Sequence, residues 1–169
     1  MANPTMTLIA SNTVGSGGVS SVTFSSIPQT YTDLVIKISA RGNSTGNYDQ
    51  LLFTFNGSTT SFTGKYIEGT GSTANSYSGG RYVFVNGNAA TTNTFGNAEV
   101  YIPNYAGSQN KSYSLDDVGE NNATNALSHL TAGLWSNTAA ITSITLDTGA
   151  YGNGILQYST FYLYGVSNS

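Results

Sequence analysis

The chain has 169 residues, and only 8% of them are charged, against about 25% in an average soluble domain. It has no cysteine, which excludes disulfides and thiolate metal sites. The formal net charge is -3, and the five lysines and arginines are scattered, so the chain lacks the basic stripe that nucleic acid needs.

The length suits one domain spanning 1–169. The N-terminus, MANPTMTLIAS, lacks the basic and long apolar regions of a secretory signal. No apolar run approaches the roughly 20 residues of a membrane-spanning helix. We therefore expect synthesis in a cytoplasm, with no membrane partner.

The clearest strand pattern lies at Thr32–Arg41, TDLVIKISAR. Leu34, Ile36, Ile38 and Ala40 fall on one face of an extended chain, which predicts a half-buried strand. Shorter segments of the same kind follow one another, separated by Gly, Asn, Ser and Thr. In chain order they are 7–10, 19–28, 50–55, 62–69, 81–85, 95–101, 111–115, 125–135, 141–146 and 156–166.

Three segments do not have a clear strand pattern. Thr70–Gly80 has almost no core-forming residues and is predicted to be an exposed loop, and Asp116–Asn122 is predicted to be an acidic turn. Asn125–Trp135 fits helical spacing loosely and alternation as well, and we predict a strand. The whole pattern predicts an all-β, single-domain antiparallel fold of about ten short strands, a sandwich or a partly closed barrel, with its first and last strands close together.

Catalytic and metal sites are weakly indicated. His129 is the only histidine, and it lies inside a predicted strand with no nucleophile motif nearby, so we expect a hydrogen-bonded structural histidine. Asp116, Asp117 and Glu120 form the one carboxylate cluster and are the candidate ligands for calcium, although EF-hand spacing is absent. We expect no enzyme activity and no cofactor.

The twelve tyrosines indicate a binding surface. Exposed tyrosine beside Asn and Ser is typical of sugar-binding and protein-binding surfaces, although tyrosine is also a good strand residue. Trp135 suits either sugar stacking or a plug at one end of the sandwich. The candidate surface residues are Tyr48, Tyr66, Tyr77, Tyr105, Tyr151 and Trp135.

Several runs resemble short structural proteins of tailed bacteriophages, cyanophages among them: SIPQTYTDLVIKISAR (26–41), LLFTFNGS (51–58), YIPNYAG (101–107), GLWSNTAAITSITL (133–146) and QYSTFYLYGV (157–166). The resemblance covers almost the whole chain and marks no functional residue. It implies a jelly-roll β-sandwich and a place on the virion.

The role favoured by this resemblance is a capsid decoration (cement) protein on the capsid exterior. It would bind the major capsid protein as a homotrimer and stabilise the shell. The alternative is a receptor-binding or carbohydrate-binding module of a tail fibre or baseplate, with a host surface glycan as its ligand. A polysaccharide-cleaving enzyme is the least favoured role.

Overall fold

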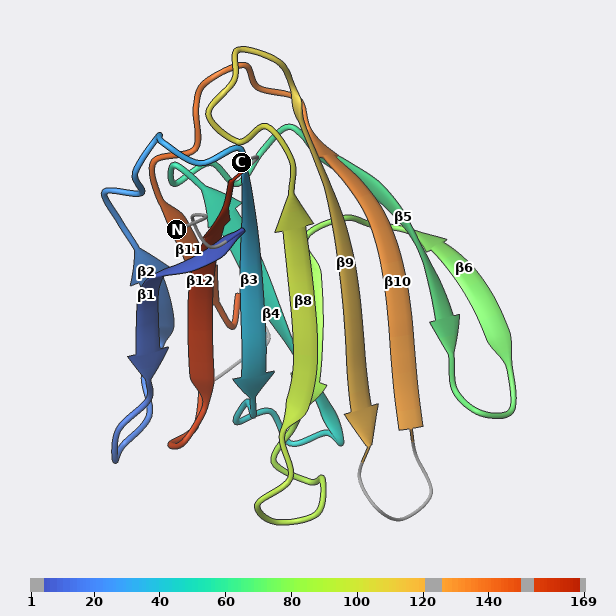
Figure 1. The fold of residues 1–169 in the computed structure, drawn as a ribbon. Helices are drawn as coiled ribbons and strands as arrows, with labels where there is room; N and C mark the ends of the chain where they lie inside the picture. The colour runs from blue at the N-terminus through green and yellow to red at the C-terminus, as the bar shows by residue number, and fades with distance from the viewer. Residues whose placement is uncertain (1–4, 121–125, 150–153, 168–169) are drawn as a thin grey trace.

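The computed structural model describes residues 5–120, 126–149 and 154–167, which form β-strands and loops (Figure 1). No helix in these ranges is long and apolar enough to cross a membrane. The described strands are β1 (Met6–Thr13), β2 (Ser21–Phe24), β3 (Asp33–Ala40), β4 (Tyr48–Phe55), β5 (Phe62–Gly69), β6 (Ala74–Ser78), β7 (Tyr82–Asn86), β8 (Gly96–Ile102), β9 (Lys111–Glu120), β10 (Ala126–Trp135), β11 (Ile144–Asp147) and β12 (Thr160–Val166).

The strands form two antiparallel sheets, which confirms the predicted β-sandwich. The large sheet has the order β1-β12-β3-β8-β9-β10-β5-β6, and the small sheet has the order β2-β11-β4-β7. The first and last strands, β1 and β12, pair directly, as predicted. The jelly-roll type remains a prediction that comes from the resemblance.

The segment with the clearest strand pattern, Thr32–Arg41, contains β3, which lies between β12 and β8 inside the large sheet. Leu34, Ile36 and Ile38 face the core and are buried, as the alternation predicts. Val35 on the other face is also buried. Its register partners on the neighbouring strands are Tyr164 and Tyr101, whose large side chains share its face and cover it.

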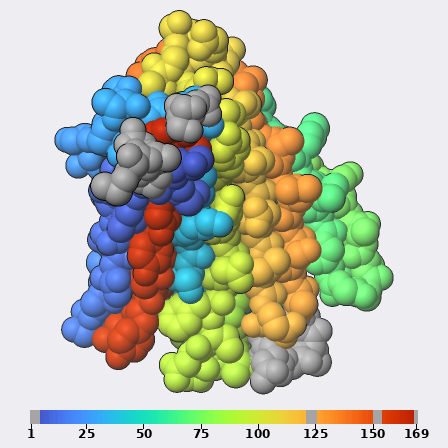
Figure 2. Space-filling model, in the orientation of Figure 1, coloured from blue at the N-terminus to red at the C-terminus, as the bar shows by residue number. Residues whose placement is uncertain are grey.

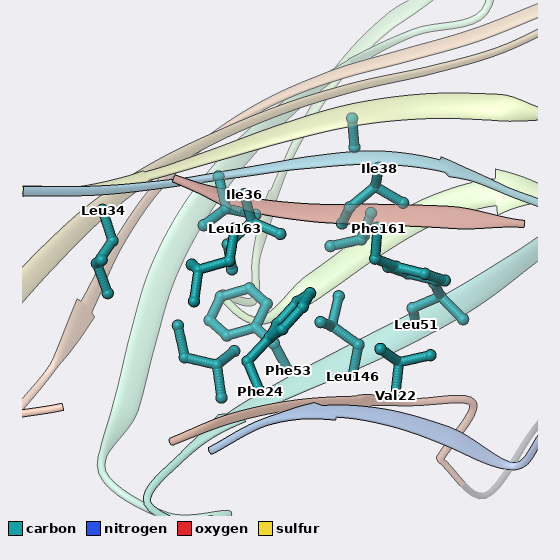
Figure 3. Packing of buried hydrophobic residues seen from close by; sticks show 14 of the residues in the cluster. Val22, Phe24, Leu34, Ile36, Ile38, Leu51, Phe53, Leu146, Phe161 and Leu163 are labelled. Atoms are coloured by element: carbon teal, nitrogen blue, oxygen red, sulfur yellow. The ribbon is translucent and has the colours of Figure 1, made fainter. Parts of the chain in front are cut away.

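The core lies between the two sheets and takes residues from both (Figure 3). Large-sheet residues such as Ile36 and Leu163 face small-sheet residues such as Leu51 and Phe53. One end of the core is an aromatic cluster with ring centroids 5.0–6.4 Å apart, made of Phe53, Phe55, Phe62, Tyr113 and Trp135. Trp135 is 1% exposed, so it fills one end of the sandwich, the second of its two predicted roles.

The two sheets differ in width. The last strand of the small sheet, β7, packs on β8 and β9 of the large sheet. Beyond β7 the large sheet continues through β10, β5 and β6, and Figure 1 shows β5 and β6 at one side of the molecule, away from the small sheet. The inner face of these strands is therefore only partly covered by the rest of the chain.

Two predicted non-strand segments are strands in the structure. The predicted loop 70–80 contains β6, whose five residues are all exposed. An edge strand needs only backbone pairing, here with β5, so its sequence carries no core pattern. The predicted acidic turn 116–122 is wrong over residues 116–120, because β9 continues to Glu120 and pairs with β8 and β10.

Two buried cations hold loops and have no acidic partner among the residues that the structure describes. The Arg41 guanidinium is 7% exposed and donates to the carbonyl oxygens of Asn88, Ala90, Thr91 and Thr94 at 2.7–3.1 Å. In the same way the Lys111 ammonium, from the start of β9, donates to three backbone carbonyl oxygens, those of Gly107, Gln109 and Thr138. In both places one buried side chain thus binds several backbone carbonyl groups at once.

We predict that Arg41→Ala lowers the free energy of unfolding by about 3 kcal/mol, because four carbonyl groups lose charge-assisted hydrogen bonds at once. Urea denaturation followed by tryptophan fluorescence measures the loss. The matched control is Lys37→Ala, which removes an exposed cation paired with Glu99 and should cost less than about 1 kcal/mol. Equal losses in the two variants would contradict the assigned role of Arg41.

Candidate functional site

A cleft of about 500 Å³ lies where the uncovered part of the large sheet meets the edge of the small sheet. One wall comes from β5 and the end of β6, and the other comes from β4, β7 and the turn before β4. The cleft is lined by Ser44, Tyr48, Asp49, Gln50, Tyr66, Ser78, Tyr82 and Phe84.

Strand alternation explains why the small-sheet side chains point into the cleft. Val83 and Val85 of β7 are fully buried in the core. Tyr82 and Phe84 therefore project from the opposite face of β7. Gln50 of β4 is the register partner of Phe84 and shares that face. The same packing that builds the core thus places these side chains in the cleft.

The aromatic rings form a partly exposed platform. The ring of Tyr66 lies 5.2 Å from the ring of its cross-strand partner Tyr77 and 6.4 Å from the ring of Phe84. Gly79 lies against two of the tyrosines, since a Cβ atom there would be 3.1 Å from Tyr82 and 3.2 Å from Tyr66. Because glycine has no side chain, the rings of Tyr66 and Tyr82 can pack close to the backbone at the C-terminal end of β6.

The polar part of the cleft is organised by Asp49. Its carboxylate is buried and accepts hydrogen bonds from the backbone N–H groups of Ser44 and Gln50, at 3.0 and 2.8 Å. The buried hydroxyl of Tyr48, another residue that lines the cleft, has no hydrogen-bond partner among the described residues. Burial, together with the nearby carboxylates of Glu120 and Glu68, raises the pKa of Tyr48. The cleft therefore combines aromatic faces with acidic and hydroxyl groups.

His129 supports the cleft from behind. Its ring stacks on Phe84 at 4.0 Å and meets the edge of Tyr66 at 5.4 Å. Its Nδ1 lies 2.7 Å from Oδ1 of Asp117, and its Nε2 lies 3.1 Å from Oε2 of Glu68. The other Asp117 oxygen accepts the backbone N–H of Phe84 at 3.1 Å. This group joins β9, β10 and β5 of the large sheet to β7 of the small one.

The geometry of this group fits a protonated histidine. A neutral imidazole has one N–H and donates to one carboxylate, whereas the imidazolium donates to both. Burial alone would lower the pKa of His129, but the hydrogen bonds and charges of Asp117 and Glu68 outweigh burial and raise it. With both nitrogens bonded to carboxylates, neither is available to activate a serine. The predicted hydrogen bonding of His129 is confirmed.

The structure separates the three calcium candidates. Asp116, Asp117 and Glu120 lie on one strand, where neighbouring side chains point to opposite faces. Asp117 is buried and bonded to His129, while Asp116 and Glu120 are on the exposed face. Among the described residues, no group of three or more acidic or histidine side chains is suited to hold a metal ion. These three residues therefore do not form one site.

Only some of the residues predicted to form a tyrosine binding surface lie close together in the structure. Tyr48 and Tyr66 line the cleft, and Tyr77 packs on Tyr66. Tyr105 and Trp135 are buried at 0% and 1% exposure, so placing them on a binding surface was wrong: both side chains fill the core. Tyr151 lies outside the described residues.

Sequence reasoning missed Tyr82, Phe84 and Gln50 as cleft residues. They lie in predicted strands, and a strand pattern does not tell which of two faces meets another layer. The available signal was the alternation of Tyr82 and Phe84 with two valines, since valine is the better core residue of the two sets.

A second hollow, of about 590 Å³, lies on the opposite face of the same strands. Its exposed side chains include Ile67 and Leu130, which are 58% and 54% exposed and are register partners. It holds no carboxylate and only one charged side chain, Lys65. The cleft is therefore the richer candidate site.

Comparison with known proteins adds no relative to this picture: no protein-family model, curated protein or solved structure matches the chain.

We predict that raising the pH above the ordinary histidine value of 6.5 destabilises the native protein. A raised folded-state pKa stabilises the fold below the unfolded value, and this contribution is lost as the pH rises through the folded value. Urea denaturation at a series of pH values measures it. His129→Gln should be less stable at pH values near 6 and should lack this fall. An equal fall in both proteins would contradict the imidazolium assignment.

Proposed function

We propose that this chain is a carbohydrate-binding β-sandwich that holds a glycan in the cleft between β4, β7 and β5. The observation that supports this most is the set of partly exposed tyrosine rings that line one cleft beside hydroxyl, amide and carboxylate groups. Sugar rings present apolar C–H faces and hydroxyl edges, and such a lining offers a partner to each.

The position of the cleft also supports binding. It is open at the corner between the two sheets, and its walls are strands, which hold side chains more rigidly than loops do. A preformed aromatic platform loses little side-chain entropy when a ligand binds. The cleft therefore suits a chain of sugar units laid across the ends of β5 and β7.

We propose binding without hydrolysis. Glycoside hydrolysis uses two carboxyl groups facing one bond, one as acid and the other as base or nucleophile. Asp117 and Glu68 are separated by the imidazole of His129, which bonds to both. Asp49 is buried and accepts two backbone N–H groups. In this arrangement the carboxylates near the cleft serve the structure.

We predict that Tyr82→Ala weakens glycan binding about tenfold, because it removes one stacking face from the cleft wall. A glycan array identifies the ligand, and calorimetry measures its affinity. The matched control is Tyr162→Ala, which removes a 37% exposed tyrosine from the outer face of β12 and should leave the affinity unchanged. Absence of any array hit at high protein concentration would overturn the proposed function.

A second candidate function is capsid decoration, the role favoured by the resemblance. It is supported by the outer face of the large sheet, seen in Figure 2. There Leu8, Tyr164 and Tyr101 lie in one cross-strand row with Val35. The next row holds Tyr162 and the paired charges Lys37 and Glu99. A broad and nearly neutral face of this kind suits contact with a protein shell.

If this chain decorates a capsid, phage heads that lack this protein should release their DNA at a higher temperature once the purified protein is added. Tyr162→Glu should weaken the effect, since it removes an aromatic ring from the contact face and adds a second carboxylate beside Lys37, and Tyr82→Ala should not. Light scattering with a DNA dye follows the release. Heads with unchanged thermal stability at saturating protein would exclude this role.

A further inference from the structure

Each of the five lysines and arginines of this chain has an assigned position away from the cleft. Arg41 and Lys111 are buried and bonded to backbone carbonyl oxygens. Lys37 lies on the outer face of β3 with Glu99. These three of the five lysines and arginines cannot meet a ligand in the cleft.

The two remaining cations also lie away from the tyrosine platform. Lys65 precedes Tyr66 on β5, so its side chain is on the opposite face, where its ammonium donates to the Ser78 hydroxyl. Arg81 lies over the ring of Phe62, 5.8 Å from its centroid, and donates to the Phe53 carbonyl oxygen. Neither side chain is among those that line the cleft.

The charges that do border the cleft are mostly negative. Asp49 is among the residues that line it, although its carboxylate is buried and bonded to the backbone N–H groups of Ser44 and Gln50. Behind the aromatic wall, the carboxyl groups of Asp117 and Glu68 bond to the two nitrogens of a single imidazole, so acidic groups outnumber basic ones there. Burial raises the pKa of the Tyr66 hydroxyl, and the nearby Glu68 carboxylate raises it further.

From this distribution of charge we infer that the cleft selects uncharged or amine-bearing sugars and rejects anionic ones such as uronates and sulfated glycans. An anionic sugar would enter a partly desolvated cleft with no counter-ion and with carboxylates nearby. A neutral sugar meets no such penalty, and an ammonium group is attracted both by the carboxylates and by the tyrosine faces. This inference rests on the proposed glycan-binding function.

The test compares three oligosaccharides with one β-1,4-linked backbone and equal length: a cello-oligosaccharide, a chitosan oligosaccharide and a cellouronate. The same three classes are compared on a glycan array in case this backbone does not fit. We expect binding of neutral or amine-bearing members at least tenfold tighter than binding of anionic ones. Equal binding of anionic members would overturn the selectivity and leave the glycan function intact. No binding in any class would overturn both.

A charge introduced at Gln50 sharpens the test. Gln50 lines the cleft and is partly exposed, so a longer side chain fits there without entering the core. Gln50→Lys should raise the affinity for anionic glycans about tenfold at low salt, and added salt should remove the gain. The matched control Gln50→Glu should bind them no better than the native protein. A Gln50→Lys protein with unchanged anion affinity would show that the cleft does not select by charge.

Discussion

The structure depends on one mismatch: a sheet of eight strands packs on a sheet of four. The small sheet covers the strands from β1 to about β9, and the core fills the space between them. The rest of the inner face would be exposed to water if nothing else covered it. Here the chain uses aromatic and titratable side chains of β5, β7 and β10 in place of aliphatic ones, and these residues form the wall of the cleft.

The group around His129 marks the end of the apolar core. Inside it lie Phe53, Phe55 and Trp135, and outside it lie partly exposed tyrosines. A buried carboxylate is costly unless it is paired and hydrogen-bonded. Asp117 meets this condition with one imidazole and one backbone N–H from the other sheet. The two sheets are thereby joined by directional bonds at a point where apolar packing alone would not fix their relative position.

Much of the fold follows from local sequence, and the site does not. Alternation predicted strands as strongly marked as β3, and it predicted β10 against a helical alternative. It failed at β6, where an edge strand buries no side chain. Tyr48, Tyr66 and Tyr82 are distant in sequence, and only the packing of one sheet beside the other brings them to one cleft. Tyr105 follows a predicted strand end at Pro103, which suggested an exposed position, but its ring is buried in the core and its hydroxyl donates to the Pro28 carbonyl oxygen.

The two buried cations have a consequence for acid tolerance. Arginine, lysine and backbone carbonyl groups keep the same protonation state from neutral pH down to strongly acidic solution. Loops held by carboxylate salt bridges lose those contacts when the carboxylates take up protons. The loops held by Arg41 and Lys111 contain no titrating partner in these contacts. These two connections should therefore keep their shape in acidic surroundings that would open a conventional ion-paired loop.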